Sequence, residues 1–449
     1  MNRHSLMHRA KVEIKMYFSK TFIDIFAGCG GLSLGLMKAG WTGLFAVEHD
    51  VNAFKTLHNN LIIGTRYQFA WPTWLPKSPL SATEVLLDYR NNLAALEGCV
   101  DMLVGGPPCQ GFSIAGRRDP SDPRNRLVDM YLEFVDLIKP RIVLIENVRG
   151  ITFDFDDINQ ATGKINYANQ IITSLSSDYV VTSKMIDASM FGVPQRRQRF
   201  FIIAIRSDLA MGLESIPFET LEHILHSFVR HKGISVIPVS AKEAISDLEI
   251  RRNGKIPSRD SIGFEEIAYG SPITSYQRLM NEGMNGLLSD TRLARHRPEI
   301  AKRFGKIIDI CHSDGRLNVS LAPEIRASFG LRKRAIRVLD PDSPSPTITS
   351  MPDDLIHYCE PRALTVRENA RLQSFPDWFE FKGKYTSGGD RRKKEVPRFT
   401  QVANAVPPLL AEAIGVALIG YLSQSVAAAN FLPNQPVPRK ALGTQGVLI

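Results

Sequence analysis

The residue whose setting most clearly suggests chemistry is Cys109, in the segment Gly105-Gly-Pro-Pro-Cys-Gln-Gly-Phe-Ser113. Two prolines stiffen the start of this segment and the flanking glycines keep its backbone narrow, so we expect Cys109 on a loop. A thiolate on a loop at a strand end can act as a nucleophile when neighbouring groups lower its pKa. The alternative for a cysteine is a small buried apolar residue, which these neighbours disfavour.

Two more segments place charged side chains after predicted strands. Glu146 directly follows the apolar run 141–145, where a carboxylate can act as a general acid, although a charge at a helix N-terminus is the simpler alternative. Arg197 and Arg199 are two positions apart in Gln195-Arg-Arg-Gln-Arg199, so on one strand they would share a face. Two guanidinium groups on one face could hold a base carbonyl and a phosphate, and a solvated basic patch is the alternative.

The segment Asp24-Ile-Phe-Ala-Gly-Cys-Gly-Gly-Leu-Ser-Leu-Gly35 predicts a glycine turn that lets the backbone approach a ligand, with tight packing as the alternative. Glu48 lies at the end of the next apolar run, 20 residues after Gly28, where a carboxylate can hold ribose hydroxyls. Because position 33 is serine, the spacing departs from G-x-G-x-x-G. This departure favours a nucleoside ligand over a dinucleotide.

Apolar runs must position these residues, and we expect each to be a buried strand: 21–26, 43–47, 100–104, 141–145 and 200–205. Helical patterns follow the first two runs. Strands that alternate with helices predict a doubly wound, Rossmann-like α/β sheet, in which ligands bind at the carboxyl ends of the strands. The chemically capable residues follow such ends.

Composition limits the class of protein. The chain has 449 residues, 44% of them hydrophobic, which suffices for an enzyme domain and a smaller second one. The net charge of +9 fits a polyanionic partner, but also fits many proteins that bind no nucleic acid. The five cysteines form no C-x-x-C pair, so we expect no metal site and a reducing cytoplasm. The apolar stretch 406–422 contains Glu412 and predicts a buried helix, not a membrane span.

From about 207 to 353 the periodicity weakens and basic residues cluster, which predicts a separate module with many loops. The clustered basic residues are Arg292, Arg295, Arg297, Arg303, Arg332, Lys333, Arg334 and Arg337. The polar segment 111–126, with four arginines, predicts a mobile lid over a phosphate backbone or a plain solvated loop.

Four of these segments, DIFAGCGG, GGPPCQGFS, ENV and QRRQR, occur in an order that resembles the DNA (cytosine-5)-methyltransferase family. Residues 362–376 (RALTVRENARLQSFP) resemble its ninth motif and 401–408 (QVANAVPP) its tenth. The resemblance covers about 21–205 and 336–422. It implies an S-adenosylmethionine-dependent methyltransferase sheet with a smaller target recognition domain.

The implied division has four parts: an N-terminal tail at 1–20, a catalytic domain at 21–208, a target recognition domain at 209–395 that includes the ninth motif, and a C-terminal segment at 396–449 that returns to the catalytic domain. The residues implied to line the S-adenosylmethionine site are Phe26, Gly28, Gly30, Leu32, Glu48, Asp88, Pro108, Leu127 and Asn404. Among them Glu48 would hold the ribose. Asp88, 21 residues before Cys109, resembles the third-motif acid that contacts the adenine amino group.

The resemblance also implies a mechanism. Cys109 would attack C6 of a cytosine flipped out of duplex DNA, so that C5 becomes nucleophilic enough to take a methyl group from S-adenosylmethionine. Glu146, protonated, would donate to N3, and Arg197, with Arg199 beside it, would hold O2. We expect a monomeric, cytoplasmic, prokaryotic enzyme of a restriction–modification system, whose endonuclease acts on the same site without obligatory contact.

Two alternatives stay open: the same chemistry on transfer RNA, and a catalytically inactive DNA-binding paralogue. Against the first, the middle region is long, about 190 residues, and lacks the short Cys-Phe-Thr element associated with the transfer RNA branch. Against the second, Cys109, Glu146, Arg197 and Arg199 are all present.

Overall fold

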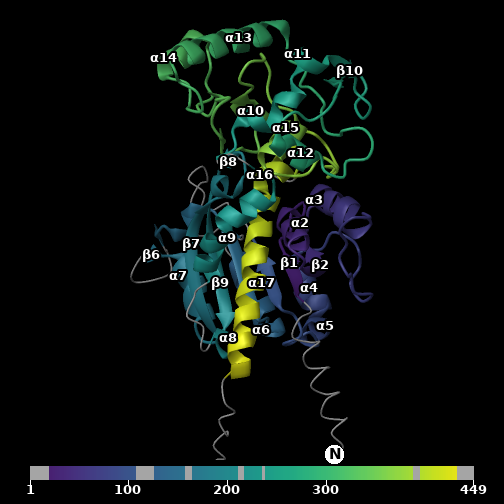
Figure 1. Cartoon of the computed structure of the whole chain (residues 1–449), viewed down its shortest axis with the longest axis vertical. Helices are drawn as coiled ribbons and strands as arrows, with labels where there is room; N and C mark the ends of the chain where they lie inside the picture. The colour runs from purple at the N-terminus through teal and green to yellow at the C-terminus, as the bar shows by residue number, and fades with distance from the viewer. Residues whose placement is uncertain are drawn as a thin grey trace, which may run out of the picture.

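The computed structural model describes residues 20–107, 126–156, 164–210, 217–234, 238–387 and 395–431. These residues form a six-stranded sheet covered by helices, with a group of shorter elements beyond one end of the sheet (Figure 1). The alternation of strands and helices in the sequence predicts this α/β architecture, and the structure confirms it.

The strands of the sheet lie in the order β2-β1-β3-β4-β9-β7. Their bounds are β1 Thr21–Ile25, β2 Thr42–Val47, β3 Met102–Gly105, β4 Ile142–Asn147, β7 Tyr179–Asp187 and β9 Gln198–Arg206. β1 to β4 are parallel, whereas β9 pairs antiparallel with both β4 and β7. The five predicted strands are confirmed within a few residues of their expected bounds. β7 carries no continuous apolar run because it is an edge strand whose side chains are mostly half-buried or exposed.

Alternate side chains of each strand enter apolar cores on opposite faces of the sheet. On β4, Ile142 and Leu144 join the core that contains the apolar residues of α2 (Gly31–Lys38) and α17 (Pro408–Phe431). Val143 and Ile145 join the other core, with α6 (Arg126–Ile138) and α7 (Tyr167–Leu175). Because both faces are buried, the central strands read as unbroken apolar runs.

α17 runs along one face of the sheet and packs against α2 and α9 (Pro217–His231), as Figure 1 shows. The stretch 398–423, which includes the first two thirds of this helix, is apolar and long enough to cross a membrane, but 78% of its most apolar window is buried inside the protein. Glu412 on α17 is also buried, and it forms ion pairs with Lys38 and Lys232. α17 is therefore a core helix that clamps α2 and α9 to the sheet.

The elements from α10 to α15 gather beyond the end of the sheet, next to α16 (Arg398–Asn404), and we call them the upper lobe (Figure 1). They are α10 (Ala241–Ile245), α11 (Ile250–Asn253), β10 (Lys255–Pro257), β11 (Glu265–Ile267), α12 (Ser275–Asn281), α13 (Pro298–Ser313), α14 (Pro323–Ser328), β12 (Arg337–Val338), β14 (Leu355–Ile356) and α15 (Val366–Leu372).

The upper lobe begins later in the chain than the second domain expected at 209–395. α9 buries its apolar stripe against α17 and β7, so 217–231 belongs to the helical layer on the sheet. The lobe also shares a core with that layer, because Leu248, Tyr276 and Phe379 lie in the same apolar cluster as the residues of α2 and α17. Continuity of this cluster means that the lobe is seated on the sheet domain by apolar packing.

Candidate active site

The carboxyl ends of the parallel strands meet at one edge of the sheet, beside the upper lobe (Figure 1). The pairing register places Ile25 at the end of β1 opposite both Val47 and Gly105, the last residues of β2 and β3. The glycine turn, Glu48 and Glu146 therefore lie where neighbouring strands end. Parallel strands bring these distant segments together, as the sequence predicts.

The glycine turn follows β1 with a run of left-handed backbone. Phe26, Gly28 and Gly30 have φ of +67°, +57° and +93°, a region that favours glycine. The Gly28 N–H donates to Oε2 of Glu48 at 2.9 Å, and the Asp50 N–H donates to Oε1 at 2.7 Å. Glu48 is only 8% exposed. These two backbone bonds fix its carboxylate beside the turn.

The end of α16 and the two residues after it, 403–406, pack directly against the glycine turn, and we call this segment the 403–406 turn. A Cβ atom at Gly31 would lie 2.5 Å from the Val406 carbonyl oxygen and 3.2 Å from the Ala405 Cβ, so only glycine allows this approach. Leu32, the next residue of α2, is buried in the apolar core. The tenth-motif segment is thus brought to the expected nucleoside site by close backbone packing.

Glu146 lies at the end of β4 and is 8% exposed. Its Oε1 lies 3.0 Å from Nε of Arg199, and a Cβ atom at Gly106 would lie 3.2 Å from its Oε2. The neighbouring Asn147 donates from Nδ2 to the Pro107 carbonyl at 3.1 Å. This last contact ties the start of the cysteine segment to the end of β4. Reasoning from the sequence alone missed Asn147, although it directly follows Glu146 in the ENV motif.

Arg197 and Arg199 do not lie on one strand. Arg197 lies between β8 (Gln195–Arg196) and β9 and belongs to neither strand. Arg197 is 1% exposed, and its Nη2 donates to the carbonyls of Ala403 at 2.8 Å and Ala405 at 3.1 Å. Burial, together with the nearby Arg199, holds the pKa of Arg197 well below its usual value. The two side chains therefore have different partners: Arg199 lies against Glu146, and Arg197 donates to the carbonyls of Ala403 and Ala405.

Asp88 lies on a helix and not at a strand end. It is the last residue of α4 (Ala82–Asp88) and is exposed. The segment before α4 instead reaches the site, because the Leu80 N–H donates to the Glu48 carbonyl at 3.0 Å. The Ser81-Ala-Thr-Glu84 capping box marks the start of α4 and is the sequence signal that could have located this contact.

Two other expected residues lie on helices near their ends. Leu127 is the second residue of α6 and is half-buried, and Asn404 is the last residue of α16 and is exposed. Cys109, Pro108 and the expected lid at 111–125 lie outside the described residues. Within the described ranges, no group of three or more His, Cys, Asp or Glu residues could hold a metal ion.

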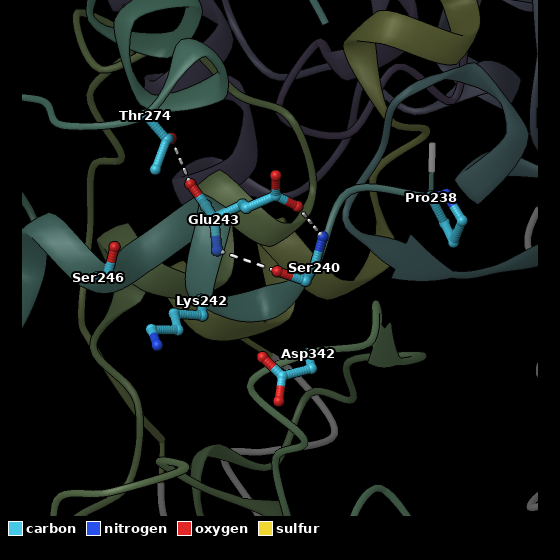
Figure 2. Close-up of a pocket in the computed structure, with 7 residues that line it drawn as sticks. All are labelled: Pro238, Ser240, Lys242, Glu243, Ser246, Thr274 and Asp342. Carbon is cyan, nitrogen blue, oxygen red and sulfur yellow. Dashed lines mark hydrogen bonds between the residues drawn. The ribbon is translucent and has the colours of Figure 1, made fainter. Parts of the chain in front are cut away.

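An open pocket of about 340 Å³ lies in the upper lobe, away from the strand ends (Figure 2). It is lined by Pro238, Ser240, Lys242, Glu243, Ser246, Thr274 and Asp342. As Figure 2 shows, Ser240 and Glu243 bond each other as the capping box of α10, and Thr274 donates to the Glu243 carbonyl. These polar groups are engaged in local structure, so the pocket offers no convergent set for chemistry.

Comparison with known proteins agrees with this geometry. The family model of C-5 cytosine-specific DNA methylase matches residues 20–420. The chain is 32% identical over 414 residues to the type II methyltransferase M.DdeI of Desulfomicrobium norvegicum, with 89% of this chain and 88% of the relative covered. It is 30% identical to the type II methyltransferase M1.HphI of Haemophilus parahaemolyticus, with 90% of each chain covered.

Among solved structures, it is similar to a DNA modification methyltransferase encoded within a prophage of E. coli, with a TM-score of 0.59 and 26% identity. The two structures align over 90% of this chain and 100% of the other. The residues that the family model matches, 20–420, include the sheet, the glycine turn, the Glu146 strand end and the upper lobe. This chain belongs to the C-5 cytosine-specific DNA methylase family.

Proposed function

We propose that this chain methylates C5 of a cytosine flipped out of duplex DNA, as the modification enzyme of a restriction–modification system. The observation that carries the proposal is the ion pair between Glu146 and Arg199 beside Gly106, on the sheet edge that also carries Glu48. A carboxyl group and a guanidinium side by side match the N3 and O2 edge of cytosine. The segment after Gly106 supplies the Cys109 nucleophile.

The residues at the glycine turn fit a nucleoside. Oε2 of Glu48 accepts one backbone N–H and keeps a lone pair for a ribose hydroxyl. No described atom lies within 4 Å of the position that a Cβ would take at Gly28, so there is open space beside the turn. S-adenosylmethionine, when bound there, supplies an electrophilic methyl group. Phe26, Gly30 and Asn404 are the other residues that we propose around it.

The protein groups then make cytosine nucleophilic. The Cys109 thiolate adds to C6 and the C5–C6 double bond opens. Glu146, which must first take up a proton from solvent, donates to N3 as negative charge develops. C5 would take the methyl group, with the thioether S-adenosylhomocysteine as the leaving group. The C5 proton would then pass to solvent, and the restored double bond would expel the thiolate. The target carbon is stacked inside duplex DNA, so the base must leave the helix first.

The geometry favours Arg199 over Arg197 as the partner of O2. Arg199 lies beside Glu146, the residue that we place at N3, whereas Arg197 has one nitrogen committed to the carbonyls of Ala403 and Ala405. We therefore propose that Arg199 holds O2 and that Arg197, held on one side by the 403–406 turn, uses its other two nitrogens to contact the flipped nucleotide elsewhere.

We propose that the upper lobe is the target recognition domain. Some of its clustered basic residues are held by neighbouring side chains, and others are exposed. Arg292 lies between the rings of Tyr385 and Phe264, 3.6 and 4.2 Å from their centroids, so it is held within the lobe. Lys333 pairs with Asp353 and Asp354. Exposed arginines remain at 295, 297, 332 and 334, and we propose that these contact the DNA backbone or base edges.

A mechanism-based trap tests the proposal. Wild-type protein should form a stable covalent adduct with duplex DNA that contains 5-fluorocytosine, because fluorine at C5 blocks the final elimination. Cys109→Ser should form no adduct, and Glu146→Gln should slow adduct formation roughly 10²- to 10⁴-fold. Equal adducts with wild type and Cys109→Ser would overturn the mechanism.

Transfer of tritiated methyl groups to transfer RNA, but not to duplex DNA, would select the transfer RNA alternative. We further propose a monomeric, cytoplasmic enzyme of a prokaryote. A cognate endonuclease would act on the same site without needing contact with it.

A further inference from the structure

A buried chain of side-chain amides joins the upper lobe to the candidate active site. The Gln195 side chain is 0% exposed, and its Oε1 accepts from the Ile348 N–H at 3.2 Å. Its Nε2 donates to Oε1 of Gln373 at 2.5 Å and to the Leu372 carbonyl at 3.2 Å. Gln373, also 0% exposed, donates from Nε2 to the Ala405 carbonyl at 2.5 Å. The amides thus connect β8, the end of α15 and the 403–406 turn.

The direction of this chain is fixed at both ends. The Ile348 N–H can only donate and the Ala405 carbonyl can only accept, so neither glutamine amide can be turned over without leaving two like groups face to face. A carboxylate at either glutamine position would likewise oppose an acceptor. The sequence shows two ordinary glutamines, one in the QRRQR segment and one in the ninth motif.

The series of amide hydrogen bonds ends at the Ala405 carbonyl, beside the candidate active site. The Ala405 carbonyl accepts from Gln373 and also from Nη2 of Arg197, so both of its lone pairs are engaged. Ala405 and Val406 pack against Gly31 of the glycine turn. Therefore one carbonyl, set by Gln373, lies between the cofactor side and the Arg197 side of the site.

Arg197 is poised for a further partner. Its Nε and Nη1 are buried, and neither makes a hydrogen bond to any of the described residues. Buried N–H groups are almost always hydrogen-bonded, so two open donors in one buried guanidinium point to a group that arrives with the substrate. The direction of these donors depends on Nη2, which the carbonyls of Ala403 and Ala405 hold.

We propose that Gln195 and Gln373 are positioning residues for methyl transfer. They hold the Ala405 carbonyl, which aims the free donors of Arg197 at the flipped nucleotide and seats Asn404 at the methyl donor. This proposal rests on the proposed function, because it assigns the nucleotide to Arg197 and the donor to Asn404.

We call the hydrogen-bonded series from Gln195 through Gln373 to the Ala405 carbonyl the relay. The isosteric change Gln373→Glu tests it through the pH dependence of kcat. At pH 8 its carboxylate would face the Ala405 carbonyl, and we expect kcat to fall roughly 10- to 100-fold relative to wild type. Burial at this position, which is 0% exposed, raises the pKa of a carboxyl, so at pH 6 part of the population is protonated and can donate again. The kcat of the variant relative to wild type should therefore rise. Gln373→Met, which cannot donate at any pH, should lose activity without this recovery.

The matched control is Gln277→Met. Gln277 is equally buried, at 0% exposure, on α12, where it bonds Ser246, Ile273 and Thr274 and makes no bond to the 403–406 turn. Its kcat should match wild type. The double variant Gln195→Met with Gln373→Met should lose no more activity than the worse single variant, because the two amides act as one chain.

Thermal unfolding gives a readout that needs no reaction. The difference in Tm between Gln373→Glu and wild type should grow more unfavourable from pH 6 to pH 8. The difference in Tm between Gln373→Met and wild type should be the same at both pH values. Wild-type protein that methylates no DNA would count against the proposed function while this readout still tests the relay. The relay would be overturned if, for Gln373→Glu, both the Tm difference and the kcat ratio to wild type were independent of pH. It would also be overturned if Gln277→Met lost as much kcat as Gln373→Met, or if the losses of kcat in the double variant were additive.

Discussion

Two buried arginines, Arg371 in the upper lobe and Arg197 in the candidate active site, have opposite surroundings. Arg371 bonds Asp377 from Nε at 2.6 Å and Asp247 from its two Nη atoms at 2.9 and 3.0 Å. Burial alone would lower its pKa, but the two carboxylates raise the pKa well above its usual value. Arg197 is equally buried, bonds only backbone carbonyls, and has its pKa lowered by burial.

The difference separates a fully bonded structural group from the group that we propose to be functional. Every guanidinium nitrogen of Arg371 is hydrogen-bonded, which fixes α15 to Ala244 of α10, to Asp247 just after α10, and to Asp377 after α15. Two of the three nitrogens of Arg197 have no bond within the described part of the chain. A native fold rarely leaves such groups open unless they have a task that needs them, such as binding a substrate.

The largest expected effect comes from removing each arginine in turn. Arg371→Met should lower the free energy of unfolding by about 3–5 kcal/mol, because it leaves Asp247 and Asp377 buried without a cation. Arg197→Met should change stability far less, since it strands no carboxylate, and should instead reduce methyl transfer. Urea unfolding of both variants measures this contrast. If Arg197→Met proved as unstable as Arg371→Met, the distinction would fail.

A smaller effect is expected at two buried carboxyl groups, whose contributions to the free energy of unfolding should change with pH in opposite directions. Asp24, beneath the glycine turn, bonds Ser33, and burial raises its pKa from 3.8 to about 7. Glu368 on α15 is also buried, but Arg362 lowers its pKa to about 2. A raised carboxyl pKa removes stability as pH rises from about 4 to about 7. A lowered one removes stability as pH falls from about 4.5 towards 2.

We therefore expect Asp24→Asn to gain stability relative to wild type between pH 4 and pH 7, by roughly 3 kcal/mol. Glu368→Gln should be destabilised at neutral pH, and this deficit should shrink in acid. Chemical denaturation across the pH range measures both. Parallel pH profiles for the two variants would contradict the assignment of Asp24 as a buried acid without a cation.

The smallest effect is expected at the surface. Arg90 and Glu133 form an ion pair whose side chains are 54% and 43% exposed. Arg90→Ala should cost less than about 1 kcal/mol, because solvent screens exposed pairs. Thermal unfolding at low and high salt measures it. A loss as large as that of Arg371→Met would show that burial is not what distinguishes these arginines.

Most of the sheet could be predicted from the sequence, because strands buried on both faces are continuous apolar runs. β7 escaped prediction because an edge strand mixes polar and apolar side chains. α9 was assigned to the second domain because a helical pattern says nothing about which surface its apolar stripe covers. The strand break at Arg197, which sends the two arginines in different directions, has no sequence signal at all.

By itself, the sequence indicated the chemistry that this protein can offer: a cysteine that follows two prolines, a glutamate at a strand end, and a glycine turn with Glu48. These features are local, because residue type and the position of a strand end suffice to define them. Only the tertiary structure decided that Glu146 pairs with Arg199, and that Arg197 joins Gln195, Gln373 and the 403–406 turn. Contacts between residues some 200 positions apart depend on how the upper lobe is seated on the sheet, which no local pattern records.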